Sequence, residues 1–131
     1  MAVLSVLFAA LGGFVIGGVW YMALAKPWMA AAGIQSTPEG KPANGRSPLP
    51  FVISAITMIL VAGMMRHMFA MAGIDSAAKG LLAGLGIGLF LIAPWTAMNY
   101  AYAMRPRALA IIDGGYAVIG CAVIGLILGL F

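Results

Sequence analysis

Four long apolar runs constrain this chain more than any other feature. Each run is close to the ~20 residues that a helix needs to cross ~30 Å of hydrocarbon. A bilayer favours helices, because every backbone polar group must be satisfied inside the segment. We therefore predict an all-α integral membrane protein, a bundle of four transmembrane helices in a single domain spanning residues 1–131. The expected helices cover residues about 3–25, 49–73, 77–104 and 108–131.

The composition agrees with lipid as the surrounding solvent. Hydrophobic residues make up 64% of the chain and charged residues 8%, far from the values of soluble domains. The net charge of +4 comes from basic residues scattered singly near the ends of the apolar runs, so nucleic acid is excluded as a partner. The first run has no Lys or Arg before it and ends near Trp20 and Tyr21, so we expect it to be retained and not cleaved as a signal peptide.

The basic residues also predict an orientation. Residues 35–48 are polar and rich in proline, which indicates a loop between the first two helices. The opposite side of the membrane holds Lys79, with Arg66 in addition if its side chain snorkels outward. The positive-inside rule then places the first and third loops in the cytoplasm and both termini outside. Five basic residues lie in the first and third connections: Lys26, Lys41, Arg46, Arg105 and Arg107.

Polar and aromatic residues gather at one depth near the cytoplasmic ends of three helices. Trp20, Asn99 and Asp113 each lie six residues from a basic residue at a helix end, which places them roughly 9 Å inside the boundary at ~1.5 Å per residue. We expect Asn99 and Asp113 to share a hydrogen bond or a water molecule there. The alternative is that the aromatic residues form an interfacial belt and that Asp113 pairs with an arginine of the turn. The predicted cluster consists of Trp20, Tyr21, Asn99, Tyr100, Asp113 and Tyr116.

Glycines four residues apart indicate where helices should touch. Such spacing lets two helix backbones approach closely in a membrane. Pro94 interrupts the third helix and removes the bond to the carbonyl of Phe90, which predicts a kink that serves either packing or the wall of a cavity. The expected packing glycines are Gly13, Gly17, Gly84, Gly88 and Gly125.

Two helix ends repeat one spacing. Tyr21 is followed after four residues by Lys26 and Pro27, and Tyr100 is followed after four residues by Arg105 and Pro106. This suggests a duplicated helical hairpin, as in transporters built from parallel repeats. Basic residues and prolines are also common after membrane helices, so the echo has a simpler explanation.

A methionine-rich stretch in the second helix offers thioether and imidazole groups, which suit Cu(I). Methionine is also a flexible apolar filler, and Arg66 among these residues would repel a cation. We therefore predict no metal site and no cofactor. The residues concerned are Met64, His67, Met68 and Met71.

Three segments resemble a known family. VWYMALAKPWM in the first helix, NYAYAMRP in the third and IIDGGYAVIG in the fourth are similar to the small bacterial membrane proteins catalogued as domain of unknown function 1761. The resemblance covers nearly the whole chain and implies four helices in the bacterial inner membrane with a polar first loop. In that family a histidine often follows the tyrosine of the fourth helix, and here Ala117 stands at that position, so no proton transfer through such a histidine is implied.

Two function hypotheses follow. The chain has no Ser/His/Asp set, no cluster of histidines and carboxylates and no phosphate-binding loop, so we expect no enzyme. The favoured hypothesis is a non-enzymatic membrane protein that acts through helix packing, as a homo-oligomer or a small subunit of a membrane complex, because glycine faces on three helices exceed what a lone bundle needs. The alternative is a small ion- or proton-coupled transporter or channel that uses Asp113.

Overall fold

The protein is helical throughout its membrane segments. The computed structural model describes residues 2–42 and 47–131, and no β-strand occurs among them. Four stretches are long and apolar enough to cross a membrane, namely Ala2–Ala23, Leu49–Ala72, Ala77–Tyr102 and Arg107–Leu130, which confirms the predicted fold class. The elements are α1 (Ala2–Ala23), α2 (Ala25–Ala32), α3 (Leu49–Ala72), α4 (Ala77–Ile87), the π-helical turn η1 (Gly88–Ile92), α5 (Ala93–Tyr102) and α6 (Arg107–Leu130).

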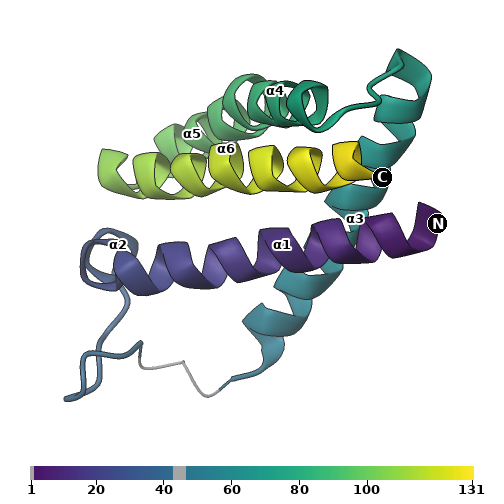
Figure 1. Cartoon of the computed structure of the whole chain (residues 1–131). Helices are drawn as coiled ribbons and strands as arrows, with labels where there is room; N and C mark the ends of the chain where they lie inside the picture. Colours follow the sequence, from purple (N-terminus) through teal and green to yellow (C-terminus); the bar gives the residue numbers. More distant parts are fainter. Residues whose placement is uncertain (1, 43–46) are drawn as a thin grey trace.

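Helix α6 is the centre of the bundle. α1 packs on one side of it and α4 and α5 on the other, all three antiparallel to α6 (Figure 1). In the apolar stretch of α6, 44% of the residues are buried, against 11% in α3 and 11% in the stretch Ala77–Tyr102. The most central helix is thus the one that carries Asp113, and the other spans leave most of their surface to lipid.

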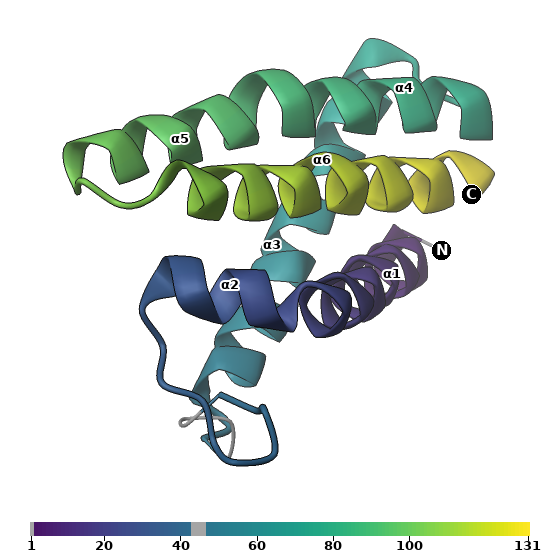
Figure 2. The same ribbon diagram turned by 90° about the vertical axis from the view of Figure 1, so that its left-hand side faces the viewer.

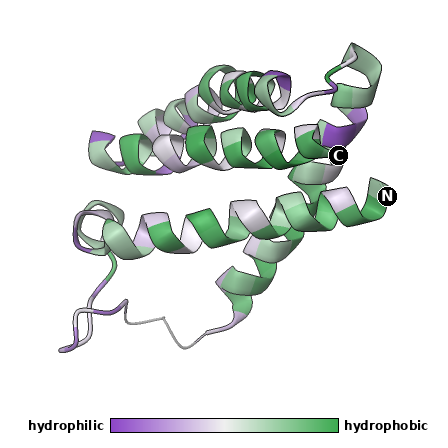
Figure 3. Cartoon of the chain, viewed as in Figure 1, coloured by the Kyte–Doolittle hydropathy of each residue, from purple (hydrophilic) through white to green (hydrophobic). Residues whose placement is uncertain are grey.

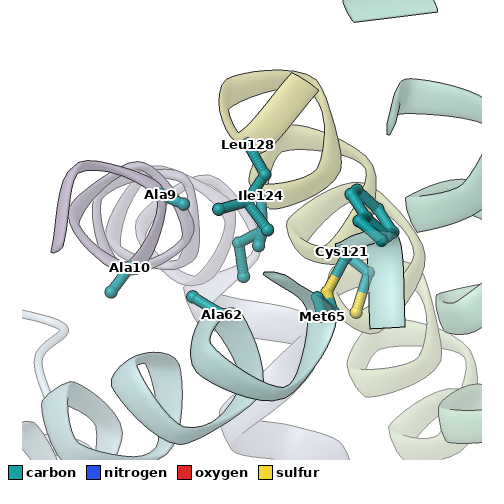
Figure 4. Close-up of a cluster of buried hydrophobic side chains, with 8 residues drawn as sticks. Ala9, Ala10, Ala62, Met65, Cys121, Ile124 and Leu128 are labelled. Carbon is teal, nitrogen blue, oxygen red and sulfur yellow. The ribbon is translucent and has the colours of Figure 1, made fainter. Parts of the chain in front are cut away.

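Helix α3 crosses the bundle steeply. Its second half packs on α1 and α6, while its first half leads away from them (Figures 1 and 2). The contact is a small core in which alanines allow close approach, with Ala9 and Ala62 fully buried and Ile124 1% exposed (Figure 4). The helices are predominantly apolar along their length, and hydrophilic residues gather toward the two ends of the bundle (Figure 3).

The ends of the bundle differ in charge. Figure 1 shows α2, the loop that follows it and the α5–α6 turn at one end, and both termini with the α3–α4 turn at the other. Lys26, Lys41, Arg105 and Arg107 belong to the first end. Arg46, the fifth basic residue of the expected orientation, lies outside the described residues.

The first helix is broken by a proline. The sequence predicted one helix to residue 25 and assigned no structure to residues 26–34, whereas α1 ends at Ala23 and α2 begins at Ala25. Pro27 has no N–H to donate to the carbonyl four residues earlier, so the helix turns there and resumes with proline in its first turn. Gly33, with φ of 73°, ends α2 in the left-handed conformation, which glycine adopts without strain.

The third span is interrupted as expected, but by a wider turn. Pro94 cannot complete the α-helical bond to Phe90, and the five residues Gly88–Ile92 just before it form the π-helical turn η1. The wider π turn accommodates the missing hydrogen bond without ending the helix. α5 therefore continues from α4 with its inner face still turned to α6.

Glycines set the distance between α4 and α6. A Cβ placed on Gly84 would lie 2.9 Å from the carbonyl carbon of Cys121 and 3.1 Å from the Cα of Ala122. Gly80 and Gly125 face one another in the same way, backbone to backbone. Because the neighbouring atoms belong to the main chain, only residues without a Cβ allow the two helices to lie this close.

Candidate functional site

One carboxylate joins three helices near the end of the bundle where α2 lies. The hydroxyl of Tyr21 on α1 donates a hydrogen bond to Oδ1 of Asp113, and the hydroxyl of Tyr100 on α5 donates one to Oδ2, each at 2.5 Å. Asp113 itself lies on α6 and is half-buried. Each carboxylate oxygen thus has a tyrosine partner from a different helix.

The two tyrosines are the ones that occupy equivalent positions in the repeated spacing, before Lys26-Pro27 and before Arg105-Pro106. They approach Asp113 from opposite sides of α6, because α1 and α5 flank this helix. The repeated spacing in the sequence therefore corresponds to two equivalent hydrogen bonds to one acceptor, the carboxylate of Asp113.

Asp113 has no cationic partner among the described residues. Among residues 2–42 and 47–131 the one ion pair joins Lys79 to Asp75 at 3.0 Å, at the other end of the bundle. Arg105, one of the two turn arginines of the alternative prediction, instead donates through its guanidinium to the carbonyl of Ala32 at the end of α2. The donors that hold the carboxylate are therefore neutral phenols.

An aromatic residue of α6 lies over a glycine of α1, and an aromatic residue of α1 lies over a glycine of α6. The ring of Tyr116 covers Gly17, where a Cβ would lie 2.6 Å from the tyrosine oxygen, and its hydroxyl donates to the carbonyl of Gly13 at 2.8 Å. In return, Trp20 covers Gly115. Its indole N–H donates to the carbonyl of Ile112 at 2.9 Å, the residue just before Asp113. These contacts fix the position of α1 along α6 at the level of the carboxylate.

A further aromatic residue, which was not part of the predicted cluster, packs against it. Trp28 of α2 lies with its ring edge-to-face against Tyr21, with ring centroids 5.5 Å apart, and Tyr116 makes the same arrangement on Tyr21 at 5.5 Å. Such pairs stabilise aromatic clusters beyond the area that they bury. The sequence signal that could have located Trp28 is Pro27, since a proline break turns the following helix back over the end of the bundle.

Asn99 is not part of the cluster. The expected direct hydrogen bond to Asp113 is absent, because the Asn99 side chain is exposed and no hydrogen bond joins it to Asp113 within the described part of the chain. Successive residues of a helix point ~100° apart, so turning Tyr100 toward α6 turns Asn99 away from it. The spacing to the basic residues placed Asn99 and Asp113 at the same depth in the membrane, but it did not specify on which face of its helix each residue lies.

The five expected packing glycines are all buried and all face another helix. Gly13 lies against Ile124 and Met58, and Gly88 lies against the backbone of α6 at Ala117 and Val118. The contacts of the remaining three, Gly17, Gly84 and Gly125, are given above.

The methionines of α3 do not gather around one point of the interior. Met64, Met68 and Met71 are exposed by 59%, 37% and 76%, and His67 is exposed as well. Met65, which belongs to the same methionine-rich stretch, is the buried one, at 2% exposure, and is part of the core. The described residues hold no group of three or more His, Cys, Asp and Glu side chains that could bind a metal ion.

Comparison with known proteins identifies one family. A family model described as protein of unknown function (DUF1761) matches residues 4–129, which is almost the entire chain. Neither a curated protein nor a solved structure matches this sequence. The match brings no activity with it, so a function must be argued from the residues of this chain.

Proposed function

The chain belongs to the DUF1761 family, and we propose that it is an integral membrane protein that acts through helix packing, in association with other copies of itself or with another membrane protein. The proposal assigns it no catalytic role. We further propose that it resides in a bacterial inner membrane, as the family resemblance implies, and that the basic residues place the α2 end in the cytoplasm and both termini outside.

The observation that carries the proposal is that both carboxylate oxygens of Asp113 accept a hydrogen bond. Tyr21 and Tyr100 bind one carboxylate oxygen each, so the residue ties α1 and α5 to α6. A polar group at this depth costs free energy unless it is paired, and here each carboxylate oxygen accepts one hydrogen bond from within the bundle. This arrangement supports a structural clamp more directly than a site that binds and releases a ligand.

Two hollows among the described residues lie away from Asp113. One is lined by residues at the α3–α4 end, including Arg66, Phe69 and Leu128. Another lies beside α2, lined by residues such as Lys26 and Ile34. Neither of these two hollows is lined by Asp113.

The clamp can be tested with single hydroxyl deletions. Tyr21→Phe and Tyr100→Phe each remove one hydrogen bond to Asp113 and should lower the free energy of unfolding by about 1 kcal/mol each. Tyr102→Phe is the matched control, because Tyr102 is 86% exposed and makes no hydrogen bond within the described residues. Reversible unfolding in mixed detergent micelles measures the effect, and two unchanged stabilities would refute the clamp.

Association is tested separately. Native mass spectrometry of the protein released from mild detergent should show a homo-oligomer or a bound membrane protein. Liposomes that contain the purified chain should conduct neither protons nor small cations above the background of empty liposomes. A flux that disappears in Asp113→Asn would overturn the packing proposal in favour of transport.

One observation favours that second function. No cation lies within 4.0 Å of Asp113 among the described residues, and two neutral hydroxyls leave the charge of an ionised carboxylate uncompensated. At membrane depth such a group is a candidate for binding a proton or a small cation. Infrared difference spectroscopy of Asp113 across a pH titration would detect its protonation, with Asp113→Asn as the control that removes the band.

A further inference from the structure

Helix α5 presents two chemically distinct faces. Its inner face carries Tyr100, which binds Asp113, and Ala93, which lies against Gly114 of α6. α5 packs on α6 and η1, and none of its residues is buried. Figure 2 shows α4 and α5 along one edge of the molecule, with α6 between them and α1. The outer face of α5 is therefore open to whatever surrounds the protein.

Three residues form a stripe along this outer face, which we call the α5 stripe: Trp95, Asn99 and Tyr102. They stand at positions i, i+4 and i+7, which share one side of a helix. Trp95 is 67% exposed and Tyr102 86%, and Asn99 is exposed between them. The α5 stripe thus combines two large aromatic side chains with an amide in the middle.

The amide lies where lipid would leave it without a partner. Asn99 belongs to the apolar span Ala77–Tyr102 and stands roughly 9 Å inside Arg105, while Trp95 stands roughly 15 Å inside, near the middle of the hydrocarbon. No hydrogen bond satisfies the Asn99 side chain in the described part of the chain. Acyl chains offer neither donors nor acceptors, so an amide facing them carries the cost of its lost hydrogen bonds.

We propose that the α5 stripe is the seam through which two copies of this chain associate in the membrane, with the two Asn99 amides hydrogen-bonding each other across a two-fold axis. An amide is both donor and acceptor, so it is complementary to an identical amide. Two copies inserted in the same direction bring Asn99 to the same depth in both, as an isologous interface requires. Polar side chains that bond between helices stabilise association in lipid.

The existence of this seam presupposes the proposed function, because the seam specifies the partner, a second copy, and the surface through which the two copies would pack. It also depends on the Asp113 clamp, because Tyr100 fixes the rotation of α5 about its own axis. With Tyr100 bound to Asp113, Asn99 is aimed away from α6 and toward a neighbour.

Cysteine crosslinking locates the seam without removing the amide. Tyr102→Cys in a background with Cys121→Ala should form a covalent dimer when membranes are treated with a mild oxidant, because symmetry-related residues of a seam approach each other. Ala101→Cys is the matched control, since it is exposed on the same helix but lies off the α5 stripe. Adding Asn99→Leu to the Tyr102→Cys protein should sharply reduce the covalent dimer.

The strength of the seam is measured by energy transfer between labelled copies in liposomes at falling protein-to-lipid ratio. Asn99→Leu should weaken the dimer about tenfold, whereas Ala101→Leu should leave it unchanged. A dimer that tolerates Asn99→Leu and does not crosslink at residue 102 would overturn the seam and leave the proposed association intact. A wild-type chain that stays monomeric at every ratio would overturn both.

Discussion

Replacing Gly84 by alanine probes a backbone-to-backbone contact between α4 and α6. The added methyl group would meet main-chain atoms of α6, with the carbonyl carbon of Cys121 at 2.9 Å and the Cα of Ala122 at 3.1 Å. Real Cβ atoms essentially never approach within 3.0 Å, and a backbone cannot rotate aside as a side chain does. α4 and α6 must therefore move apart if the variant is to fold.

The matched control stands two residues away on the same helix. A Cβ on Gly86 would have no heavy atom within 4 Å. Both variants gain the same helix propensity, about 0.5–1 kcal/mol for alanine over glycine, so this gain cancels when Gly84→Ala is compared with Gly86→Ala. What remains is the cost of forcing a group into a filled interface, about 1–3 kcal/mol. We expect Gly84→Ala to be less stable than Gly86→Ala by that amount.

The assay is reversible unfolding in mixed micelles with increasing denaturing detergent, followed by tryptophan fluorescence. The free energies of unfolding of the two variants are compared directly, with the wild type between them. Equal stability of Gly84→Ala and Gly86→Ala would show that α4 and α6 do not touch through their backbones. That result would refute the account of the glycine face of α4.

Three further perturbations test other contacts. Gly17→Leu should displace the ring of Tyr116 and destabilise the bundle by about 1–3 kcal/mol; an unchanged melting temperature of the purified variant would contradict the packing of α1 on α6. Tyr116→Phe removes the hydrogen bond to the carbonyl of Gly13 and should lower the free energy of unfolding by about 1 kcal/mol, measured in the same micelles. The hydrogen bond from Lys79 holds the pKa of Asp75 below its ordinary value of 3.8, so this exposed pair contributes its small stabilisation above that pH and loses it as the pH falls through the lowered pKa. Wild-type protein and Asp75→Asn should accordingly converge in stability in strong acid, and a difference that persists there would contradict the pairing.

Much of the architecture could be predicted from the sequence because its causes are local. The length of an apolar run decides whether a segment can cross the membrane, and the need to satisfy backbone groups makes that segment a helix. The six-residue spacing to a basic residue placed Trp20 and Asp113 at one level by simple helix geometry. The structure shows a contact at that level, from the indole of Trp20 to the residue before Asp113.

The loss of a backbone hydrogen bond at a proline is also a local effect, but the conformation that the chain adopts in response is not determined locally. Pro94 predicted an interruption, yet whether the chain bends or widens into the turn η1 depends on how α4 and α5 both keep contact with α6. Pro27 is a similar case. It breaks the first helix, and only contacts with α6 and the bond between Arg105 and Ala32 decide that α2 folds over the end of the bundle.

What tertiary structure alone decided is the rotation of each helix about its own axis. In a soluble bundle the apolar stripe of a helix identifies its inner face, but most of these helices are apolar on every side, so hydrophobicity alone does not distinguish a neighbouring helix from lipid. Only the glycine spacing indicated contact faces in the sequence. Asn99 and Tyr100 show the consequence, since both residues lie near the depth of Asp113 and both side chains can donate a hydrogen bond to a carboxylate. The tyrosine reaches the carboxylate because α5 packs on α6 through Ala93 against Gly114, and the rigid helix then carries Asn99 to the opposite, open face. The sequence determined which groups meet at one level of the membrane, and the packing of backbones against glycines determined which of them touch.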